Sequence, residues 1–375
     1  MTKICVIGLG YVGLPILINL SKRFNCIGYD INSKRVKQLT KGKDIFNEFS
    51  PTDLKSKKVF FTNSKNKIKN YNLFIVAVPT PIYENKKPNL SYLKNVCNTI
   101  SKILKPKDIV IFESTVYPSV TDEFCIPILE NKSKLKHGLD FYVGYSPERV
   151  NPGDNKHGLK KINKILAYPH EYFKKNLINI YSKVSRKIIF TNNIKEAETA
   201  KVIENIQRDV NIGLINEIYL VCKKLNINFD NVIRLASTKW NFLKFKPGLV
   251  GGHCLPVDPY YFSYISKKNK INTKITLAGR YINDEMSNVV LENIKTKIKK
   301  LDPNRKKKIL ICGLSYKTNV ADLRNSLSLK IFNNLRKKNK KIFGYDPLID
   351  IDNAKKMKLV LRENQINNFD IIFVL

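Results

Sequence analysis

The stretch Gly8-Leu-Gly-Tyr-Val-Gly13 decides the fold of this chain. It follows an apolar run at residues 3–9 and leads into residues 14–20, whose apolar positions have helical spacing. A second apolar run at residues 26–29 ends at Asp30. This is the arrangement that binds dinucleotides: a strand, a turn with three spaced glycines, a helix, and a second strand that ends in an acid. The alternative that this pattern leaves open is a structural glycine turn in another α/β protein.

Each glycine of this turn has its own purpose in dinucleotide binding. The first makes the tight turn, the second admits the pyrophosphate, and the third lets helix and strand pack, with the phosphates at the helix N-terminus. Asp30 is expected to accept hydrogen bonds from the adenosine ribose. Its charge repels a 2′-phosphate, so the pattern favours NAD over NADP. Lys34 and Arg35 stand close enough in the sequence to leave NADP open.

Further apolar runs alternate with helical segments along the first half of the chain. Strands are predicted at residues 73–78, 109–112 and 141–144, and helices near 91–104 and 121–130. Such alternation builds a parallel, doubly wound sheet, and ligands bind beyond the carboxyl ends of its strands. The candidate site residues that follow these strands are Thr80, Thr115 and Glu148. Helix capping is the alternative for each of them.

Two long helices are predicted in the middle of the chain, at residues 196–225 and 275–299. In the first, Lys201 and Asn205 stand four residues apart, so both lie on one face beside an apolar stripe. Ordinary surface positions are the alternative for both residues. The stripe carries more apolar surface than a linker requires, which predicts a homodimer packed along this helix.

A second α/β unit is predicted from residue 309 onward. There a strand, Gly313, a polar loop, a helix at 327–337 and a strand at 341–345 repeat the rhythm of the first unit. The chain ends within the apolar run 370–375, so we expect a shortened last domain. The predicted fold class is α/β, with two Rossmann-like doubly wound domains joined by a long-helix central domain. The predicted domains are residues 1–195, 196–300 and 301–375.

Cys254 lies in a loop rich in glycine and proline, Pro247-Gly-Leu-Val-Gly-Gly-His-Cys-Leu-Pro-Val-Asp-Pro-Tyr-Tyr261. Its glycines permit positive φ and close approach of the backbone to a bound group, while Pro256 and Pro259 stiffen the exit. Such a loop suits a thiol presented to a ligand. A tight turn around a small buried cysteine is the alternative, because Cys is usually a core residue. The local sequence leaves the two open.

The composition bears on partners and compartment. The formal net charge of +36 attracts polyanions, but the lysines are spread through nearly every segment without a basic stripe. We therefore interpret them as a solvated coat and predict no nucleic-acid partner. The seven Cys and four His lack metal-ligand spacing, so no metal is predicted. Most cysteines lie within apolar runs, and the sequence shows neither a signal-peptide pattern nor an apolar run of about 18 residues. We therefore predict a cytoplasmic protein without a membrane partner.

Together these motifs resemble the UDP-glucose/GDP-mannose dehydrogenase family along essentially the whole chain. The matching motifs are Gly8-Leu-Gly-Tyr-Val-Gly-Leu-Pro15, Val78-Pro-Thr-Pro81, Glu113-Ser-Thr115, Ser146-Pro-Glu148, Ala200-Lys-Val-Ile-Glu-Asn205, Gly251-Gly-His-Cys254 with Asp258, and Gly313-Leu-Ser-Tyr-Lys317 with Asp322 and Arg324. Within the family, Tyr145-Ser-Pro-Glu-Arg-Val-Asn-Pro-Gly-Asp154 and His253 are most similar to the branch that acts on UDP-N-acetylglucosamine or its C4 epimer. That branch supplies uronic acids for surface polysaccharides.

The resemblance implies a four-electron oxidation, with NAD, of the C6 hydroxymethyl of a nucleotide sugar to a carboxylate. Cys254 would add to the intermediate aldehyde, giving a thiohemiacetal that is oxidised to a thioester. Lys201 and Asn205 would bind the oxyanion at C6. Asp258 would lie near Cys254 and Lys201, where it would order the attacking water and assist proton movement.

The resemblance also implies the remaining contacts. Glu148 would be the base for thioester hydrolysis, with Thr115 orienting the water. Cofactor contacts are expected from Gly8, Gly10, Tyr11, Val12, Gly13, Asp30, Arg35, Thr80, Thr115 and Arg324. Substrate contacts are expected from Glu148, Arg149, Lys201, Asn205, Lys244, Gly251, Arg280 and Lys317. The first predicted domain would bind NAD, the second would carry the dimer contact and the cysteine, and the third would bind the nucleotide sugar.

Three alternatives remain open at this point. A UDP-glucose or UDP-N-acetylmannosamine 6-dehydrogenase would use the same residues. A non-catalytic nucleotide-sugar-binding remnant is suggested by the short last domain, although all the catalytic residues are present. Nucleic-acid binding through the charge of +36 is the third alternative.

Overall fold

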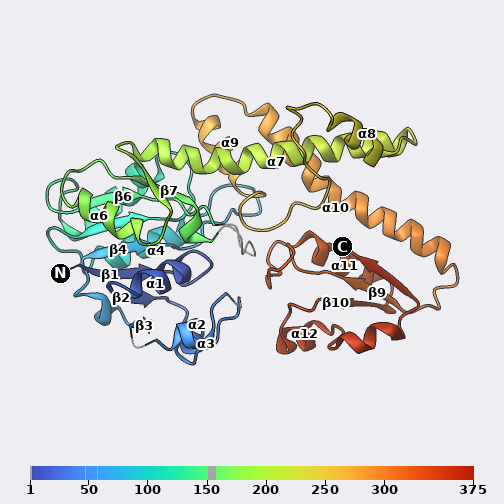
Figure 1. Cartoon of the computed structure of the whole chain (residues 1–375), viewed down its shortest axis with the longest axis horizontal. Coiled ribbons are helices and arrows are strands. Elements are labelled where there is room, and N and C mark those ends of the chain that lie inside the picture. The colour runs from blue at the N-terminus through green and yellow to red at the C-terminus, as the bar shows by residue number, and fades with distance from the viewer. Residues whose placement is uncertain (1, 47, 57, 151–157) are drawn as a thin grey trace. The chain divides into compact units, whose positions relative to one another are not determined.

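The computed structural model describes residues 2–46, 48–56, 58–150 and 158–375. The chain divides into two compact units (Figure 1). The first comprises Met1–Glu204 and Tyr260–Asn269, and the second comprises Asn205–Pro259 and Lys270–Leu375.

An eight-stranded sheet forms the centre of the first unit in the described part of the chain. Its strands are β1 (Lys3–Ile7), β2 (Asn25–Tyr29), β3 (Val59–Thr62), β4 (Leu73–Val76), β5 (Ile109–Phe112), β6 (Tyr142–Tyr145), β7 (Asn163–Ala167) and β8 (Lys187–Thr191). Their order is β3-β2-β1-β4-β5-β6-β7-β8, and neighbours are parallel except β6 and β7. The winding direction reverses between β1 and β4, which is where ligands bind in such sheets.

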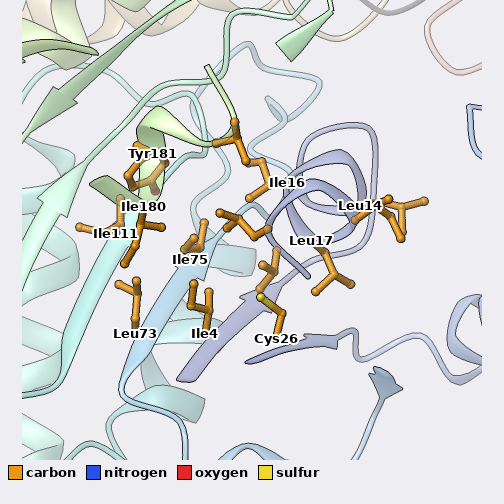
Figure 2. Close-up of a cluster of buried hydrophobic side chains, with 14 of the residues drawn as sticks. Ile4, Leu14, Ile16, Leu17, Cys26, Leu73, Ile75, Ile111, Ile180 and Tyr181 are labelled. Carbon is orange, nitrogen blue, oxygen red and sulfur yellow. The ribbon is translucent and has the colours of Figure 1, made fainter. Parts of the chain in front are cut away.

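Helices cover this sheet and bury its strands. The helices of this unit are α1 (Gly13–Ser21), α2 (Ser33–Thr40), α3 (Pro51–Leu54), α4 (Ser91–Ile100), α5 (Ile126–Ser133) and α6 (Lys174–Ser182), with the 3-10 turns η1 (Lys65–Ile68) and η3 (Leu159–Lys161) and the π-turn η2 (Thr121–Cys125). Most of α9 (Asp258–Lys268) also belongs to this unit. The strands β4 and β5 are apolar and buried at every position, as expected of parallel strands covered on both faces. Ile16 and Leu17 of α1 belong to the same buried cluster as Ile4, Ile75 and Ile111 of the strands (Figure 2).

Long helices form the first part of the second unit. They are α7 (Ile194–Lys224), which begins in the first unit, α8 (Phe229–Ala236) and α10 (Lys274–Leu301). Two glycines allow α7 and α10 to approach closely. A Cβ on Gly213 would lie 2.7 Å from the carbonyl oxygen of Gly279, and a Cβ on Gly279 would lie 3.0 Å from Cα of Val210.

A three-stranded parallel sheet completes the second unit in the described residues. It has the order β10-β9-β11, with β9 (Ile309–Cys312), β10 (Ile342–Tyr345), β11 (Ile371–Val374), α11 (Leu327–Lys338), α12 (Ile351–Met357) and the 3-10 turn η4 (Glu363–Asn368). Ile331, Phe332 and Leu335 of α11 pack with Ile309 and Ile311 of β9 in a second core.

The predicted α/β fold is confirmed, and several elements differ in detail. The segment expected as one helix at 121–130 begins as the π-turn η2 and continues as α5, while the helix expected at 91–104 ends at Ile100. The strands β3, β7 and β8 were not predicted, because β3 has only four residues and a lysine interrupts or opens the apolar runs of β7 and β8.

Candidate active site

The glycine turn after β1 is shaped by two positions that only glycine fits. Gly8 has a φ of +93°, and a Cβ there would lie 2.5 Å from the carbonyl oxygen of Ala77. A Cβ on Gly13 would lie 1.9 Å from the carbonyl oxygen of Gly8. Gly10 differs from both, because a Cβ there would have no atom within 4 Å. The packing of the protein does not require this glycine, whereas a pyrophosphate approaching the N-terminus of α1 would require it.

Asp30 stands beside this turn at the end of β2. Its Oδ2 accepts a hydrogen bond of 2.9 Å from the backbone N–H of Leu9, and its Oδ1 accepts one of 2.8 Å from Asn32. These contacts hold the carboxylate next to the glycines. The residues of the first turn therefore fit a dinucleotide.

Arg35 supports the turn from inside the protein. Its Nε donates to the carbonyl oxygen of Leu9 at 3.0 Å, and its guanidinium pairs with Asp44 at 2.9 Å. The ring of Phe46 lies against the Arg35 guanidinium and stacks on the ring of Tyr11, with centroids 4.0 Å apart. Arg35 is buried, and the contacts above show that it supports the glycine turn. Its role as a cofactor contact stays a prediction.

Loops at the carboxyl ends of β4 and β5 bring two predicted residues together. The hydroxyl of Thr80 donates to the carbonyl oxygen of Thr115 at 2.6 Å. Tyr261 of α9 donates its hydroxyl to the carbonyl oxygen of Thr80 at 2.5 Å. The two threonines are thus held at the same sheet edge, as the parallel topology predicts.

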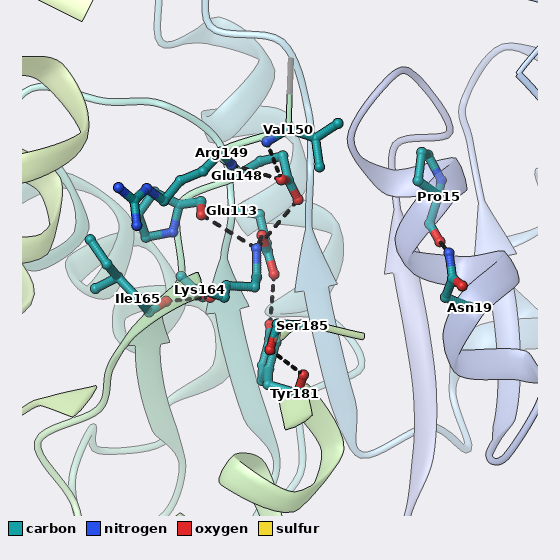
Figure 3. Close-up of polar contacts among 12 residues, drawn as sticks. Pro15, Asn19, Glu113, Glu148, Arg149, Val150, Lys164, Ile165, Tyr181 and Ser185 are labelled. Carbon is teal, nitrogen blue, oxygen red and sulfur yellow. Dashed lines mark hydrogen bonds and ion pairs between the residues drawn. The ribbon is translucent and has the colours of Figure 1, made fainter. Parts of the chain in front are cut away.

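Glu148 follows β6 and is buried (Figure 3). Its Oε1 accepts hydrogen bonds from the backbone N–H groups of Arg149 and Val150, both at 2.7 Å. Its Oε2 lies 3.4 Å from Nζ of Lys164. The guanidinium of Arg149 points elsewhere, because it pairs with Glu204 at 2.7 Å.

A second carboxylate, Glu113, lies behind Glu148. Nζ of Lys164 is 2.5 Å from Oε2 of Glu113, and the hydroxyl of Tyr181 donates to Oε1 of Glu113 at 2.8 Å. Burial raises the pKa of Glu113 to about 7 even though Lys164 opposes the shift. Burial lowers the pKa of Lys164, but Glu113 and Glu148 outweigh this effect and raise it. Lys164 was not predicted. The one available signal was a lysine at an inward-facing position of the strand sequence Asn-Lys-Ile-Leu-Ala.

Cys254 is exposed, unlike the other six cysteines, five of which are buried. The start of its loop is held by Asn216 of α7, whose side chain exchanges two hydrogen bonds with the backbone of Gly248, at 2.8 and 3.1 Å. After the cysteine, the backbone N–H groups of Val257 and Asp258 donate to the carbonyl oxygen of Cys254 at 3.0 and 2.9 Å. The exposed thiol excludes the interpretation of Cys254 as core filler.

Asp258, Asn205 and Lys201 are all buried. Nδ2 of Asn205 donates to Oδ2 of Asp258 at 2.6 Å, so α7 is connected to the turn that contains Cys254. Lys201 lies one turn earlier on the same helix. Ordinary surface positions are therefore excluded for Lys201 and Asn205.

Arg280 lies in the protein interior and has no exposed surface. Its guanidinium is fully buried, lies 2.5 Å from Asp209 and 3.2 Å from Asp284, and donates to the carbonyl oxygen of Leu255 at 3.4 Å. Burial raises the pKa of Asp209 to about 6, and Arg280 opposes this shift. Arg280 therefore supports the cysteine loop through Leu255, and its role as a substrate contact stays a prediction.

The loop after β9 also contacts the cysteine loop within the second unit. Oδ2 of Asp322 lies 3.2 Å from Nε2 of His253 and accepts from the Arg324 guanidinium at 2.6 Å. Burial raises the pKa of Asp322, but the hydrogen bonds from His253 and Arg324 dominate and hold it well below its usual range. A Cβ on Gly251 would lie 2.8 Å from the carbonyl oxygen of Asn325, so this glycine allows the two loops to pack.

Two further predicted substrate residues lie in loops of the second unit. Lys244 is exposed, and Lys317 is half-buried in the loop after β9. Their roles stay predictions.

No group of three metal-ligating side chains occurs among the described residues. Within the same part of the chain, no helix combines the length and the apolar composition needed to cross a membrane.

The class that the sheet topology and the glycine turn define is a dinucleotide-binding protein. Comparison with known proteins then identifies the family: the chain belongs to the UDP-glucose/GDP-mannose dehydrogenase family. Residues 2–185 match its NAD binding domain, 195–285 its central domain and 310–375 its UDP binding domain. The predicted family, NAD as cofactor and nucleotide-sugar dehydrogenase activity are confirmed.

Individual relatives agree with this assignment. The chain is 41% identical to the UDP-N-acetyl-D-glucosamine 6-dehydrogenase of Salmonella typhi, over 99% of this chain and 89% of the relative. It is 41% identical to the protein of the same name from Pseudomonas aeruginosa, over 94% and 84% of the two chains. Among solved structures, the UDP-N-acetyl-mannosamine dehydrogenase Cap5O of Staphylococcus aureus superposes with a TM-score of 0.83 at 30% identity, over 100% of this chain and 88% of that one.

Proposed function

We propose that this chain oxidises the C6 hydroxymethyl of UDP-N-acetylglucosamine to the carboxylate, through a covalent intermediate on Cys254, and so supplies a uronic acid for surface polysaccharide. The observation that carries the covalent mechanism is the exposed thiol of Cys254, in a loop anchored by the buried side chains of Asn216 and Arg280. The substrate is favoured by 41% identity to the two enzymes named for it, against 34% and less to those named for UDP-N-acetyl-D-mannosamine.

The turn from Gly8 to Gly13 and the carboxylate of Asp30 would hold NAD, with further contacts from Thr80 and Arg324. The chemistry that bound NAD would supply is a hydride acceptor for C6 in each of the two oxidations. Tyr11, Val12 and Arg35 belong to the same proposed cofactor site, in which Arg35 acts through the backbone of the turn.

Cys254 supplies the covalent chemistry. Its thiolate adds to the carbonyl carbon of the C6 aldehyde, and the resulting thiohemiacetal can lose a hydride to become a thioester. The buried ammonium of Lys201 and the amide of Asn205 stabilise the oxygen at C6 while it carries negative charge. Asp258 accepts a hydrogen bond from Asn205 and thereby orients this amide.

Hydrolysis of the thioester needs a base and a positioned water. We assign the base to Glu148 and the orientation of the water to Thr115. Arg149, Lys244, Gly251 and Lys317 are proposed substrate contacts. Arg280 stays a proposed substrate contact, and its hydrogen bond to Leu255 also supports the loop of Cys254.

A homodimer along α7 is also proposed. The support is a row of apolar side chains on this helix that are about half exposed, namely Ile203, Leu214 and Val221 at 47%, 54% and 52%. We further propose the domain bounds 1–195, 196–300 and 301–375, and a cytoplasmic location that suits seven cysteines without a disulfide.

The proposed function is tested by measuring NAD reduction by the purified chain with UDP-N-acetylglucosamine, UDP-N-acetylmannosamine and UDP-glucose. We expect two NADH per sugar and the highest kcat/KM with UDP-N-acetylglucosamine. Cys254→Ser should retain sugar-nucleotide binding and lose steady turnover. Normal turnover by this variant would exclude the covalent mechanism, and a preference for UDP-N-acetylmannosamine would exclude the proposed substrate.

A further inference from the structure

Lys164 is a fully buried lysine on β7, inside the first unit. Among the described residues, three groups lie within hydrogen-bonding distance of its Nζ: Oε2 of Glu113 at 2.5 Å, the carbonyl oxygen of Pro147 at 3.3 Å and Oε2 of Glu148 at 3.4 Å (Figure 3). Burying an ammonium costs several kcal/mol unless it is well paired. The cluster is therefore a built feature of the fold, and it lies next to the residue assigned as the base.

One ammonium faces two glutamate side chains in this cluster, and Glu113 is the closer of the two. Tyr181 donates to the other oxygen of Glu113, so both oxygens of Glu113 are occupied. Glu113 and Tyr181 thus fix the position of the ammonium, and the ammonium is left to act on Glu148.

Both oxygens of Glu148 are defined by contacts from its own surroundings. Two backbone N–H groups hold Oε1, and the ammonium of Lys164 is the cation nearest to Oε2 among the described contacts. Arg149 contributes only its backbone, because its guanidinium is paired with Glu204. Removing the Lys164 ammonium would leave Oε2 without this charged partner.

We propose that Lys164 is a positioning residue for the hydrolytic half of the reaction: anchored by Glu113 and Tyr181, it holds the Glu148 carboxylate in the orientation that accepts a proton from water. This inference rests on the proposed function. In the step concerned, the oxygen of water bonds to the thioester carbon and a proton passes to Glu148. The bond from that carbon to the Cys254 sulfur breaks, and the sulfur leaves as the thiolate. No electron is transferred to an acceptor in this step.

The test is Lys164→Met, compared with Lys161→Met as a matched control. Lys161 lies three residues earlier and is exposed. With NAD and UDP-N-acetylglucosamine, Lys164→Met should lower kcat by about tenfold to a hundredfold, a part of what a general base contributes, with little change in KM for NAD. Intact-protein mass spectrometry during turnover should show the sugar acyl group accumulating on Cys254. Lys164→Arg should recover part of the rate, and Lys161→Met should behave as the wild type.

The reference variant is Glu148→Gln, which should accumulate the same acyl adduct. If Glu148→Gln accumulates the adduct and folded Lys164→Met does not, Lys164 is only structural and the inference is wrong. If Glu148→Gln does not accumulate it, the assignment of the base fails, and the role of Lys164 fails with it.

A variant with an uncompensated buried charge can fail to fold. For that case, Lys164→Met combined with Glu113→Gln removes the ammonium and one of the facing carboxylates together, while Glu148 still lacks its cation. This double variant should also accumulate the adduct. Wild-type hydrolysis in the folded double variant would overturn the proposal.

Discussion

The turn after β1 and the turn after β9 share the same backbone geometry but lead to different binding surfaces. Gly8 has a φ of +93°, and its N–H donates to the carbonyl oxygen of Tyr29 at 2.9 Å. Gly313 has a φ of +81°, and its N–H donates to the carbonyl oxygen of Tyr345 at 3.0 Å. In each unit the glycine thus continues the parallel ladder by one more hydrogen bond before the chain leaves the sheet.

The acid that ends the neighbouring strand locks both turns. Asp30 accepts from the N–H of Leu9 at 2.9 Å, and Asp346 accepts from the N–H of Leu314 at 2.8 Å. Asp346 goes further, because the same oxygen also accepts from the N–H and the hydroxyl of Ser315. In the second unit the carboxylate is therefore more heavily committed to the turn.

The two turns differ in the helix that follows each of them. In the first unit α1 begins at Gly13, directly after the turn, so its N-terminus is available to an anion. In the second unit α11 begins at Leu327, and its N-terminus is capped by Ser326. The glycine and the acid therefore belong to the fold, whereas pyrophosphate binding depends on a helix that starts at once and on further glycines.

The largest expected effect on stability comes from adding a side chain at Gly13 in the first turn. Gly13→Ala places a Cβ 1.9 Å from a backbone oxygen, and the turn cannot give way without losing the packing of α1 on β1. We expect a loss of about 4 kcal/mol in the unfolding free energy of the first unit. Hydrogen exchange measured by mass spectrometry in urea reports each unit separately. The second unit should keep its protection, and an unchanged first unit would contradict the close packing.

The next largest effect is a difference between the units in how their unfolding free energy depends on pH. Glu198 of α7 accepts hydrogen bonds from Ser119 and Thr121, and burial raises its pKa to about 7. The folded state therefore favours the protonated form. Its contribution to stability is complete below pH 4.5 and is lost as the pH rises to 7, by about 3 kcal/mol for one proton.

Glu198→Gln should remove this titration and leave that of Glu113. The unfolding free energy of the variant should therefore fall less than that of the wild type between pH 5 and 7, as urea denaturation of the first unit measures. Asp322 gives the contrast in the second unit, because its lowered pKa keeps it ionised throughout this range. Parallel curves for the variant and the wild type would show that Glu198 does not titrate there.

Loss of Asp346 should affect stability alone, whereas loss of Asp30 should affect both stability and NAD binding. Asp346→Ala removes three hydrogen bonds to one oxygen and should cost about 2 to 3 kcal/mol in the second unit. Asp30→Ala removes the contacts with Leu9 and Asn32, should cost about 1 to 2 kcal/mol in the first unit and should weaken NAD binding. Calorimetric titration with NAD tests the second part, for which Asp346→Ala is the control. Equal NAD affinities in the two variants would contradict the contrast.

Sequence reasoning located the features that depend on local order. The glycine spacing predicted the turn and Asp30, and parallel topology predicted that Thr80 and Thr115 share an edge. The loop composition drew attention to Cys254. In each case the signal lay within a few residues or followed from the alternation of strands and helices.

The buried polar contacts were not predictable in the same way. Lys164 meets a carboxylate 51 residues earlier in the chain, and Asn216 meets a loop 32 residues later. Periodicity assigns a face to such a side chain but not its partner. For the same reason the pairing of Arg280 with Asp209 in the core was not predicted.

The smallest effect on stability is also the sharpest test of the difference between the turns. Gly10→Ala adds a Cβ with no atom within 4 Å, so the unfolding free energy of the first unit should stay within about 0.5 kcal/mol of the wild type. NAD should nevertheless bind at least about tenfold more weakly, since the added methyl occupies the space that the pyrophosphate needs. Binding of UDP alone should be unchanged and serves as the control. If NAD affinity survived, the open space at Gly10 would have no part in cofactor binding. The two turns would then differ in the contacts of their acids and in the helix that follows each of them, but not in space for a pyrophosphate.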